Sequence, residues 1–249
     1  MVRIIISGIL GRMGGAVLEA CLADDGVSVV AGVDRESGTY MNIPIFSGIA
    51  DCDVPCDVIV DFSAPAACAD LCAYCAKKKV KLVMCTTGHS EEQLADLERL
   101  SADVAVFRSA NMSLGVAVMK KLAVEAARIL HEKYDIEIIE KHHNKKIDAP
   151  SGTARMLADA MNSACSNAYD YVYDRTQERR PRADSEIGIS SVRGGTIPGE
   201  HEILFAGTDE TLTITHTAYS RKLFAGGAVA AAKFIARQKR GMYDMDALV

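Results

Sequence analysis

The sequence predicts an α/β protein with two parts, a doubly wound parallel sheet followed by an α+β domain. Short apolar runs alternate with helical patterns through about the first 110 residues, which is typical of strands and helices in alternation. Beyond residue 110 the pattern changes to a long helix and several half-exposed strands. The composition is that of a folded globular protein, since 49% of the 249 residues are hydrophobic and 24% are charged.

The first part begins with a strand pattern over Val2–Ser7. This run is apolar and rich in β-branched residues, as expected for a strand buried on both faces. The other predicted strands are Ser28–Asp34, Val58–Asp61, Lys81–Cys85 and Val104–Phe107, and the predicted helices are Arg12–Ala23, Ala66–Lys78 and Glu91–Ser101. Such alternation predicts parallel strands with helices on both faces of the sheet.

The second part opens with a long helical segment, Leu114–His131. In the strand pattern that follows, Ile136, Ile138 and Glu140 alternate with residues of the other face. The remaining predicted elements are a helix at Ala154–Ala164, a polar loop at Ser166–Ser185, strands at Ile187–Val192, His201–Phe205 and Thr211–Thr217, and a final helix at Lys222–Arg237. The Gly/Pro turns between these strands predict a largely antiparallel sheet, and the final helix could return to the first part.

Three glycines lie between the first predicted strand and the first predicted helix. Gly8, Gly11 and Gly14 would let backbone N–H groups approach a pyrophosphate at the positive end of a helix. Glycines at a strand–helix junction can also be purely structural. Asp34, twenty residues after Gly14, lies where an acid accepts hydrogen bonds from an adenosine ribose, and Arg35 could pair with a 2′-phosphate. The sequence therefore predicts a Rossmann-like domain that binds NADH or NADPH.

Two later strand ends carry small polar residues. In an open parallel sheet, ligands bind at the carboxyl ends of the strands, so we expect the nicotinamide near these loops. The residues are Thr86, Thr87 and Gly88 after one strand, and Ser109, Ala110, Asn111 and Met112 after the next.

A basic segment, KHHNKKIDAPSGT at Lys141–Thr153, predicts proton transfer beside an anion site. Histidine titrates near neutral pH, and a lysine close to other cations gives up a proton more readily. Ser151 or Thr153 can cap the helix that follows, and the N–H groups of Gly152 and Thr153 would then face a bound carboxylate. A solvated charged loop is the alternative for the lysines alone.

We expect no metal site. The adjacent histidines lack a third ligand at a suitable spacing, and the nearby lysines repel a cation. Cys68, Cys72 and Cys75 have a CxxxCxxC spacing that can hold an iron–sulfur cluster, but offsets of four and seven place them on one helix face. We interpret them as core cysteines. A radical iron–sulfur enzyme is the rival class, and a non-catalytic dinucleotide-sensing module is another, although the latter has no use for the basic segment.

The charge balance indicates a small-molecule partner. The net charge is −5 and the pI about 5.7, so no global attraction to nucleic acid or an anionic membrane is expected. The start, MVRIIISG, is too short for a signal peptide, and no apolar stretch is long enough to span a bilayer. We expect a cytoplasmic protein.

Several segments together resemble one family, the 4-hydroxy-tetrahydrodipicolinate (dihydrodipicolinate) reductases of the diaminopimelate route to lysine. These segments are GILGRMG, VDFS, CTTG, SANMSLGV, IEIIEKHHNKKIDAPSGTA, VRGG with GEHEILFA, and ITHTAYSRKLFAGGA. They follow the family order over nearly the whole chain, and the long basic segment is the most specific. The nearest alternative is another NAD(P)-dependent imine or amino-acid reductase of the same architecture, such as an aspartate dehydrogenase-like enzyme.

The resemblance implies a reaction and its residues. NADH or NADPH would reduce a cyclic imine with two carboxylates to tetrahydrodipicolinate. His142 would donate or accept a proton, Lys146 would donate one, and His143, Gly152 and Thr153 would hold a substrate carboxylate. The implied cofactor residues are Gly8, Ile9, Leu10, Gly11, Arg12, Met13, Asp34, Arg35, Thr86, Thr87, Gly88, Ser109, Ala110, Asn111 and Met112.

The resemblance also implies the domain organisation. Residues 1–110 and 219–249 would form the dinucleotide-binding domain, and residues 111–218 a substrate-binding and oligomerisation domain whose open mixed sheet builds a homotetramer. Arg221 matches the family pattern, and an interdomain ion pair is its alternative role. One departure is the presence of Ile9 and Leu10 in the glycine turn, where a small residue is expected.

Overall fold

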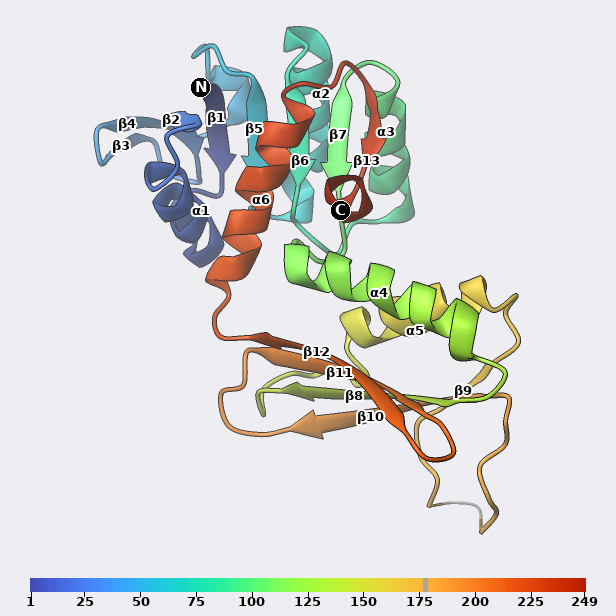
Figure 1. Cartoon of the computed structure of the whole chain (residues 1–249). Helices are drawn as coiled ribbons and strands as arrows, with labels where there is room; N and C mark the ends of the chain where they lie inside the picture. Colours follow the sequence, from blue (N-terminus) through green and yellow to red (C-terminus); the bar gives the residue numbers. More distant parts are fainter. Residues whose placement is uncertain (177–178) are drawn as a thin grey trace. The chain divides into compact units, whose positions relative to one another are not determined.

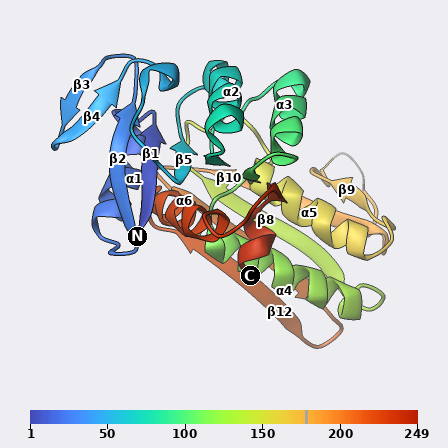
Figure 2. The same cartoon turned by 90° about the horizontal axis from the view of Figure 1, so that it is seen from above.

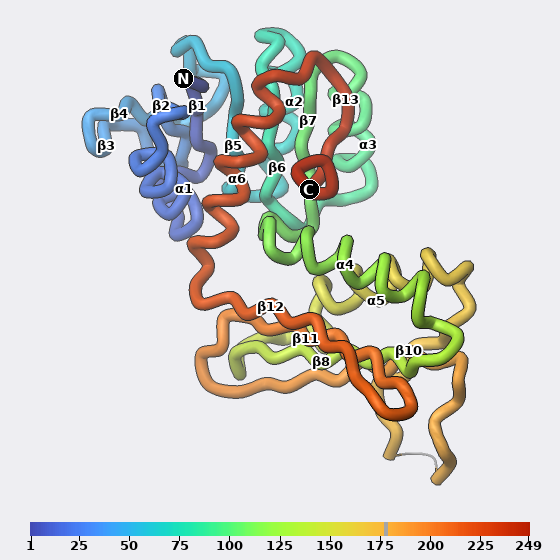
Figure 3. The backbone as a smooth tube through the Cα atoms, viewed as in Figure 1, coloured from blue at the N-terminus to red at the C-terminus, as the bar shows by residue number. Residues whose placement is uncertain are grey.

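The computed structural model describes residues 1–176 and 179–249, which divide into two compact units. Unit 1 comprises Met1–Leu114 and Arg221–Val249, and unit 2 comprises Gly115–Ser220. The chain enters unit 2 once, through helix α4 (Leu114–Leu130), and returns to unit 1 at helix α6 (Lys222–Ile235) (Figure 3). The role predicted for each unit remains a prediction. In the described ranges, no helix is both long and apolar enough to cross a membrane.

Unit 1 is built on one sheet. Among the described residues it has eight strands in the order β13-β7-β6-β5-β1-β2-β4-β3, and all neighbours are parallel except β3 and β4 (Figure 1). The strands are β1 (Val2–Ser7), β2 (Val27–Val33), β3 (Gly38–Tyr40), β4 (Ile43–Phe46), β5 (Val58–Asp61), β6 (Lys81–Met84), β7 (Ala105–Arg108) and β13 (Gly241–Tyr243). β5 is wholly buried, and β1 is buried from Ile4 to Ser7, as their apolar runs predict.

Helices cover both faces of this sheet. α1 (Arg12–Leu22) and α6 lie on one face, and α2 (Cys68–Lys78) and α3 (Glu91–Ser101) lie on the other (Figure 2). α3 begins with a capping box, in which the Ser90 hydroxyl accepts from the N–H of Gln93 and the Gln93 side chain accepts from the N–H of Ser90. The predicted doubly wound parallel domain is confirmed.

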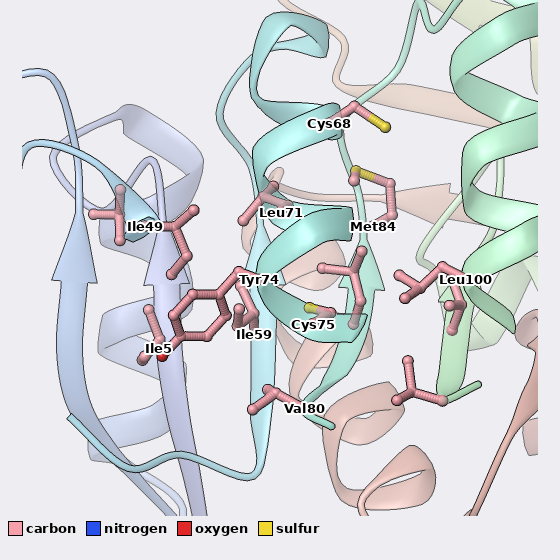
Figure 4. Close-up of a cluster of buried hydrophobic side chains, with 14 of the residues drawn as sticks. Ile5, Ile49, Ile59, Cys68, Leu71, Tyr74, Cys75, Val80, Met84 and Leu100 are labelled. Atoms are coloured by element: carbon pink, nitrogen blue, oxygen red, sulfur yellow. The ribbon is translucent and has the colours of Figure 1, made fainter. Parts of the chain in front are cut away.

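The cysteines of α2 lie in the core of unit 1. Cys68 and Cys75 are fully buried among Leu71, Tyr74 and Met84 (Figure 4). Cys72 is half-buried and packs against the same cluster. Burial raises the pKa of the Cys72 thiol to about 12 and raises that of the Cys75 thiol well above its ordinary value. These thiols therefore stay protonated and pack as small apolar groups. Within residues 1–176 and 179–249, no three His, Cys, Asp or Glu side chains gather closely enough to hold a metal ion.

Unit 2 consists of a second sheet with helices α4 and α5 (Gly152–Ala164) on one face. In the described chain the strand order is β12-β11-β8-β10-β9, with β8 (Asp135–His142), β9 (Asp170–Val172), β10 (Glu186–Arg193), β11 (Gly199–Ala206) and β12 (Thr211–Ala218). Alternate residues of the strands, such as Ile138 and Phe205, are buried with Met119 of α4 and Leu157 of α5. Their neighbours, such as Ile139, point to the opposite face of the sheet and are only partly buried.

The open mixed sheet that the resemblance implies for unit 2 is confirmed, whereas the largely antiparallel pairing expected from the turns is wrong, because β10 pairs with β8 and β9 in parallel. The chain reaches β10 from β8 through α5, and such a crossover brings the second strand back in the same direction. The predicted loop at Ser166–Ser185 contains β9, and Gln177 and Glu178 of that loop lie outside the described residues. The short strands β3, β4 and β13 were not predicted.

Candidate active site

The loops predicted to hold a dinucleotide leave one edge of the unit 1 sheet. They follow β1, β2, β6 and β7, and because these strands are parallel their carboxyl ends share that edge. The loop after β5, with Phe62 and Ser63, emerges at the same edge. This is the edge at which open α/β sheets bind ligands.

The glycine turn after β1 has no room for side chains. Gly8 has φ +80°, and a Cβ on it would lie 2.7 Å from the carbonyl oxygen of Phe62. A Cβ on Gly14 would lie 2.0 Å from the carbonyl oxygen of Gly8. The turn therefore closes tightly against the start of α1, which directs the first N–H groups of that helix toward the sheet edge.

The two bulky residues of the turn point in different directions. Ile9 is fully buried and fills the space left by Gly32 of β2, where a Cβ would lie 2.6 Å from its Cγ2. Leu10 is exposed. The departure from the family pattern thus leaves the turn intact, and the side chain of Ile9 is directed into the core.

A cavity of about 520 Å³ adjoins the turn. The predicted residues on its wall are Gly8, Leu10, Gly11, Asp34 and Arg35, and residues not predicted there include Ser47, Gly48, Ser63, Ala64 and Asp70. The side chain of Asp34 is held by the N–H of Leu10 and by its own neighbour's N–H at Arg35, both at 2.8 Å. Each carboxylate oxygen keeps a lone pair for a ribose hydroxyl. The glycine cradle, the oriented acid and the cavity fit the adenosine half of a dinucleotide.

The other two predicted cofactor loops lie elsewhere along the edge and do not line this cavity. The Thr86 hydroxyl donates to Asp61 at 2.5 Å, and the Ser63 hydroxyl donates to the other oxygen of Asp61, also at 2.5 Å. In the loop after β7, the Ser109 hydroxyl donates to the carbonyl oxygen of Asn111. Asp61 is fully buried, and its contacts with Ser63 and Thr86 connect the loop after β5 with the loop after β6.

In unit 2, His142 ends β8 and is held by an acid two residues before it. Its Nδ1 lies 2.5 Å from Oε2 of Glu140, on the same face of the strand. The side chain of Glu140 is fully buried and that of His142 is 11% exposed. Burial lowers the pKa of His142 below its ordinary value, and Glu140 opposes this shift. The imidazole is therefore neutral at neutral pH.

Glu140 also receives a bidentate pair of hydrogen bonds from Arg193 at the end of β10. The distances from the two Nη atoms to Oε1 and Oε2 are 2.7 and 2.8 Å. Burial alone would raise the pKa of Glu140, but hydrogen bonds from Arg193, His142 and Ser191 outweigh it and hold the pKa at about 2. The carboxylate thus stays ionised in the interior.

The predicted anion turn starts α5. Ser151 is the N-cap, and its hydroxyl accepts from the N–H of Ala154 at 3.1 Å. The same hydroxyl lies 3.0 Å from Nε2 of His201, whose ring packs edge-on against that of His142. Gly152 and Thr153 form the first helical turn, and a Cβ on Gly152 would meet no atom within 4 Å. Open space therefore adjoins the helix end that favours an anion.

The basic cluster is smaller than the sequence suggests. Lys141 points to the opposite face of β8, where it pairs with Glu200. Lys146 is partly buried, and its Nζ lies 2.8 Å from Asp148. Its charge nevertheless contributes to the lowered pKa of His142, so Lys146 and His142 are neighbours. His143 lies in the loop after β8, which hydrogen bonds tie to Gly194 and Gly195.

Sequence reasoning missed several residues of both sites. Arg193 and His201 hold the unit 2 site, and Asp61 holds the unit 1 loops, whereas Ser151 caps α5 as one of the two residues expected to do so. The alternation of IEIIEKH could have singled out Glu140, because an acid on the buried face of a strand needs a partner. Arg193 belongs to the VRGG segment, but no local pattern connects it with Glu140, which is 53 residues away.

The comparisons with known proteins agree with this arrangement. Two family models match, "Dihydrodipicolinate reductase, N-terminus" over residues 2–112 and "Dihydrodipicolinate reductase, C-terminus" over residues 115–249. The chain belongs to the dihydrodipicolinate reductase family. The predicted resemblance, and with it the class of NAD(P)H-dependent oxidoreductase, is confirmed.

Individual members of this family match over their whole length. The 4-hydroxy-tetrahydrodipicolinate reductase of Caldanaerobacter subterraneus subsp. tengcongensis is 47% identical and covers 100% of this chain and 98% of its own length. That of Clostridium tetani is 43% identical and covers 100% and 97%. A dipicolinate-bound dihydrodipicolinate reductase from Paenisporosarcina sp. TG-14 superposes with a TM-score of 0.84 at 25% identity and 100% coverage of both chains.

Proposed function

We propose that this dihydrodipicolinate reductase reduces the cyclic imine formed from 4-hydroxy-tetrahydrodipicolinate to tetrahydrodipicolinate, a step of lysine and diaminopimelate biosynthesis. NADH or NADPH supplies the hydride. The observation that carries the proposal is the Glu140–His142 pair beside the start of α5, in a chain that matches both family models from end to end. This match favours the reductase over the aspartate dehydrogenase-like alternative.

His142 and Lys146 move the protons. Once hydride has been added to the ring, the electron-rich enamine needs a proton at carbon. Lys146 carries an ammonium group that can donate, and the neutral His142 can accept a proton at Nε2 and pass it on. The charge that forms on the imidazole is stabilised by Glu140.

His143, Gly152 and Thr153 hold one substrate carboxylate. The first turn of α5 is open to an anion, and the helix dipole favours negative charge there. A dicarboxylate is also the ligand named for the Paenisporosarcina relative, dipicolinate, which supports an anion site of this kind.

Unit 1 binds the cofactor. The N–H groups of the turn from Gly8 to Met13 face the pyrophosphate, Asp34 accepts from the ribose, and Arg35 offers a charge to a 2′-phosphate. The presence of both side chains on one cavity wall supports use of NADH as well as NADPH. The loops Thr86–Gly88 and Ser109–Met112 lie toward the nicotinamide.

We also propose a cytoplasmic homotetramer. All eight cysteines are free thiols, which suits a reducing compartment. Helices α4 and α5 cover one face of the unit 2 sheet, and on the other face partly buried apolar residues such as Ile139 and Leu204 can pack against a second copy.

The test is a coupled assay. Pyruvate and aspartate semialdehyde, condensed by a synthase, generate the substrate, and absorbance follows oxidation of NADH or NADPH. We expect oxidation that depends on both precursors. Oxidation with oxaloacetate and ammonium but none in the coupled assay would instead support the aspartate dehydrogenase-like alternative.

A further inference from the structure

Glu140 joins the two halves of the proposed substrate site. Its carboxylate accepts from Nδ1 of His142, from both Nη atoms of Arg193 and from the backbone N–H of Ser151, the last at 3.1 Å. Both oxygens are engaged and the side chain is fully buried. The loss of any one of these donors would leave the buried charge without full compensation, which costs free energy. The donors therefore hold the carboxylate in one position.

The contact with Glu140 selects the tautomer of His142. An ionised carboxylate can only accept a hydrogen bond, so Nδ1 must carry the proton and Nε2 is left with its lone pair. Gly199 keeps this second nitrogen clear, since a Cβ at position 199 would lie 3.1 Å from Nε2. The proton-exchanging atom of the ring is therefore set by one neighbour and left accessible by another.

The same carboxylate positions the anion turn. The N–H of Ser151 binds Oε1 of Glu140, and Ser151 is the residue that starts α5. Arg193 extends the connection, because its Nη2 also donates to the carbonyl oxygen of Asp148 at 2.6 Å. Asp148 and Ser151 flank the turn that leads to Gly152 and Thr153.

We propose that Glu140, clamped by Arg193, is the positioning residue that sets the proton-exchanging nitrogen of His142 and fixes its place relative to the carboxylate-binding turn. This inference rests on the proposed function, in which His142 transfers protons.

The charged and titratable groups that face His142 come from four elements. They are Glu140 on β8, Lys146 in the following loop, Arg193 on β10 and His201 on β11. Glu140 is the acid among them and raises the pKa of His142, whereas burial, Lys146 and Arg193 lower it. Removing the charge of Glu140 should thus move the acidic limb of the pH profile to lower pH.

The experiment compares Glu140→Gln with a matched control. Glu125→Gln also removes an acid paired with an arginine, Arg128, but on the exposed surface of α4. For Glu140→Gln we expect kcat to fall by at least roughly 10–100-fold, the loss found when the partner that orients a metal-bound histidine is removed, with unchanged NADH binding and a lower-pH acidic limb. For Glu140→Asp, which keeps the charge, the acidic limb should lie between that of Glu140→Gln and that of the wild type. Glu125→Gln should match the wild type.

Two further measurements separate the possible failures. Folded Glu140→Gln with unchanged kcat and an unshifted limb would overturn the positioning role, while His142→Gln that keeps full turnover would overturn the proposed function itself. If Glu140→Gln does not fold, the wild-type tautomer decides. Histidine-selective ¹⁵N NMR should show His142 protonated at Nδ1, and protonation at Nε2 alone would contradict the proposal.

Discussion

The two proposed binding regions differ in the chemical groups that form them. The pyrophosphate cradle of the unit 1 site is made of backbone, because its glycine turn admits no side chain at Gly8 or Gly14, and the side chains of Asp34 and Arg35 complete the cavity wall. The unit 2 site is made of side chains, with a buried carboxylate that holds a histidine, an arginine and a helix start. A site made of backbone can bind a ligand by shape and N–H groups, whereas one made of buried ionisable groups can also move protons.

This contrast predicts that substitutions in the two regions have separable effects. Changes in the glycine turn should weaken cofactor binding, and changes in the unit 2 network should slow turnover with the cofactor still bound.

Removal of the proposed proton donor should have the largest effect. Lys146→Gln keeps a polar side chain but lacks the ammonium group, and we expect kcat to fall by about 10²–10⁴-fold, the usual contribution of a positioned proton donor. The adjacent exposed Lys145 provides the control, since Lys145→Gln should stay within about twofold of wild type. Steady-state rates in the coupled assay measure both, and equal effects of the two substitutions would argue against the role of Lys146.

Adding a side chain to the glycine turn should weaken NADH binding by at least about tenfold, a loss of about 1.4 kcal/mol. In Gly14→Ala the new Cβ would meet the carbonyl oxygen of Gly8 at 2.0 Å, so the turn must open. Gly15→Ala is the matched control, because a Cβ there meets no atom within 4 Å and alanine favours the helix. Fluorescence titration with NADH compares the two, and tight binding by Gly14→Ala would show that the turn is not the cofactor site.

Acid should destabilise the unit 2 network. Burial, together with His142, lowers the pKa of His201 to about 4, so the folded form keeps it neutral while the unfolded chain protonates it below about 6.5. The stabilisation is complete above pH 6.5 and is lost as the pH falls toward 4, amounting to on the order of 3 kcal/mol. Thermal unfolding between pH 7 and 4 should show a falling midpoint, and His201→Gln should flatten this dependence. If the unfolding midpoint falls equally with pH in the wild type and in the variant, groups other than His201 cause the loss of stability in acid.

The sequence predicted the long elements well and the contacts between them poorly. β-branched runs such as Val2–Ser7 and the apolar period of Glu91–Ser101 are local signals, and both elements have the predicted bounds. Strands of three residues, such as β3 and β9, are too short to show a period. The parallel pairing of β10 with β8 depends on the path of the chain through α5, which no strand pattern contains.

The same limit applies to the site. The histidines, lysines and glycines of Lys141–Thr153 can be recognised because they are adjacent in the sequence. Arg193, His201 and Asp61 act through contacts between distant positions, so only the fold brings them to their partners. Lys141 shows the opposite case. It is adjacent to His142 in the sequence, but side chains alternate along the strand, so Lys141 points to the other face of the sheet.

The most direct test of the claim that unit 1 binds the cofactor and unit 2 transfers protons is the variant His142→Gln. Its NADH affinity and its turnover are measured in the same preparation. Glutamine keeps a polar side chain but cannot exchange a proton near neutral pH. We expect an NADH affinity within about twofold of wild type and a fall in kcat of about 10²–10⁴-fold. Turnover at the wild-type rate, or loss of NADH binding together with turnover, would contradict it.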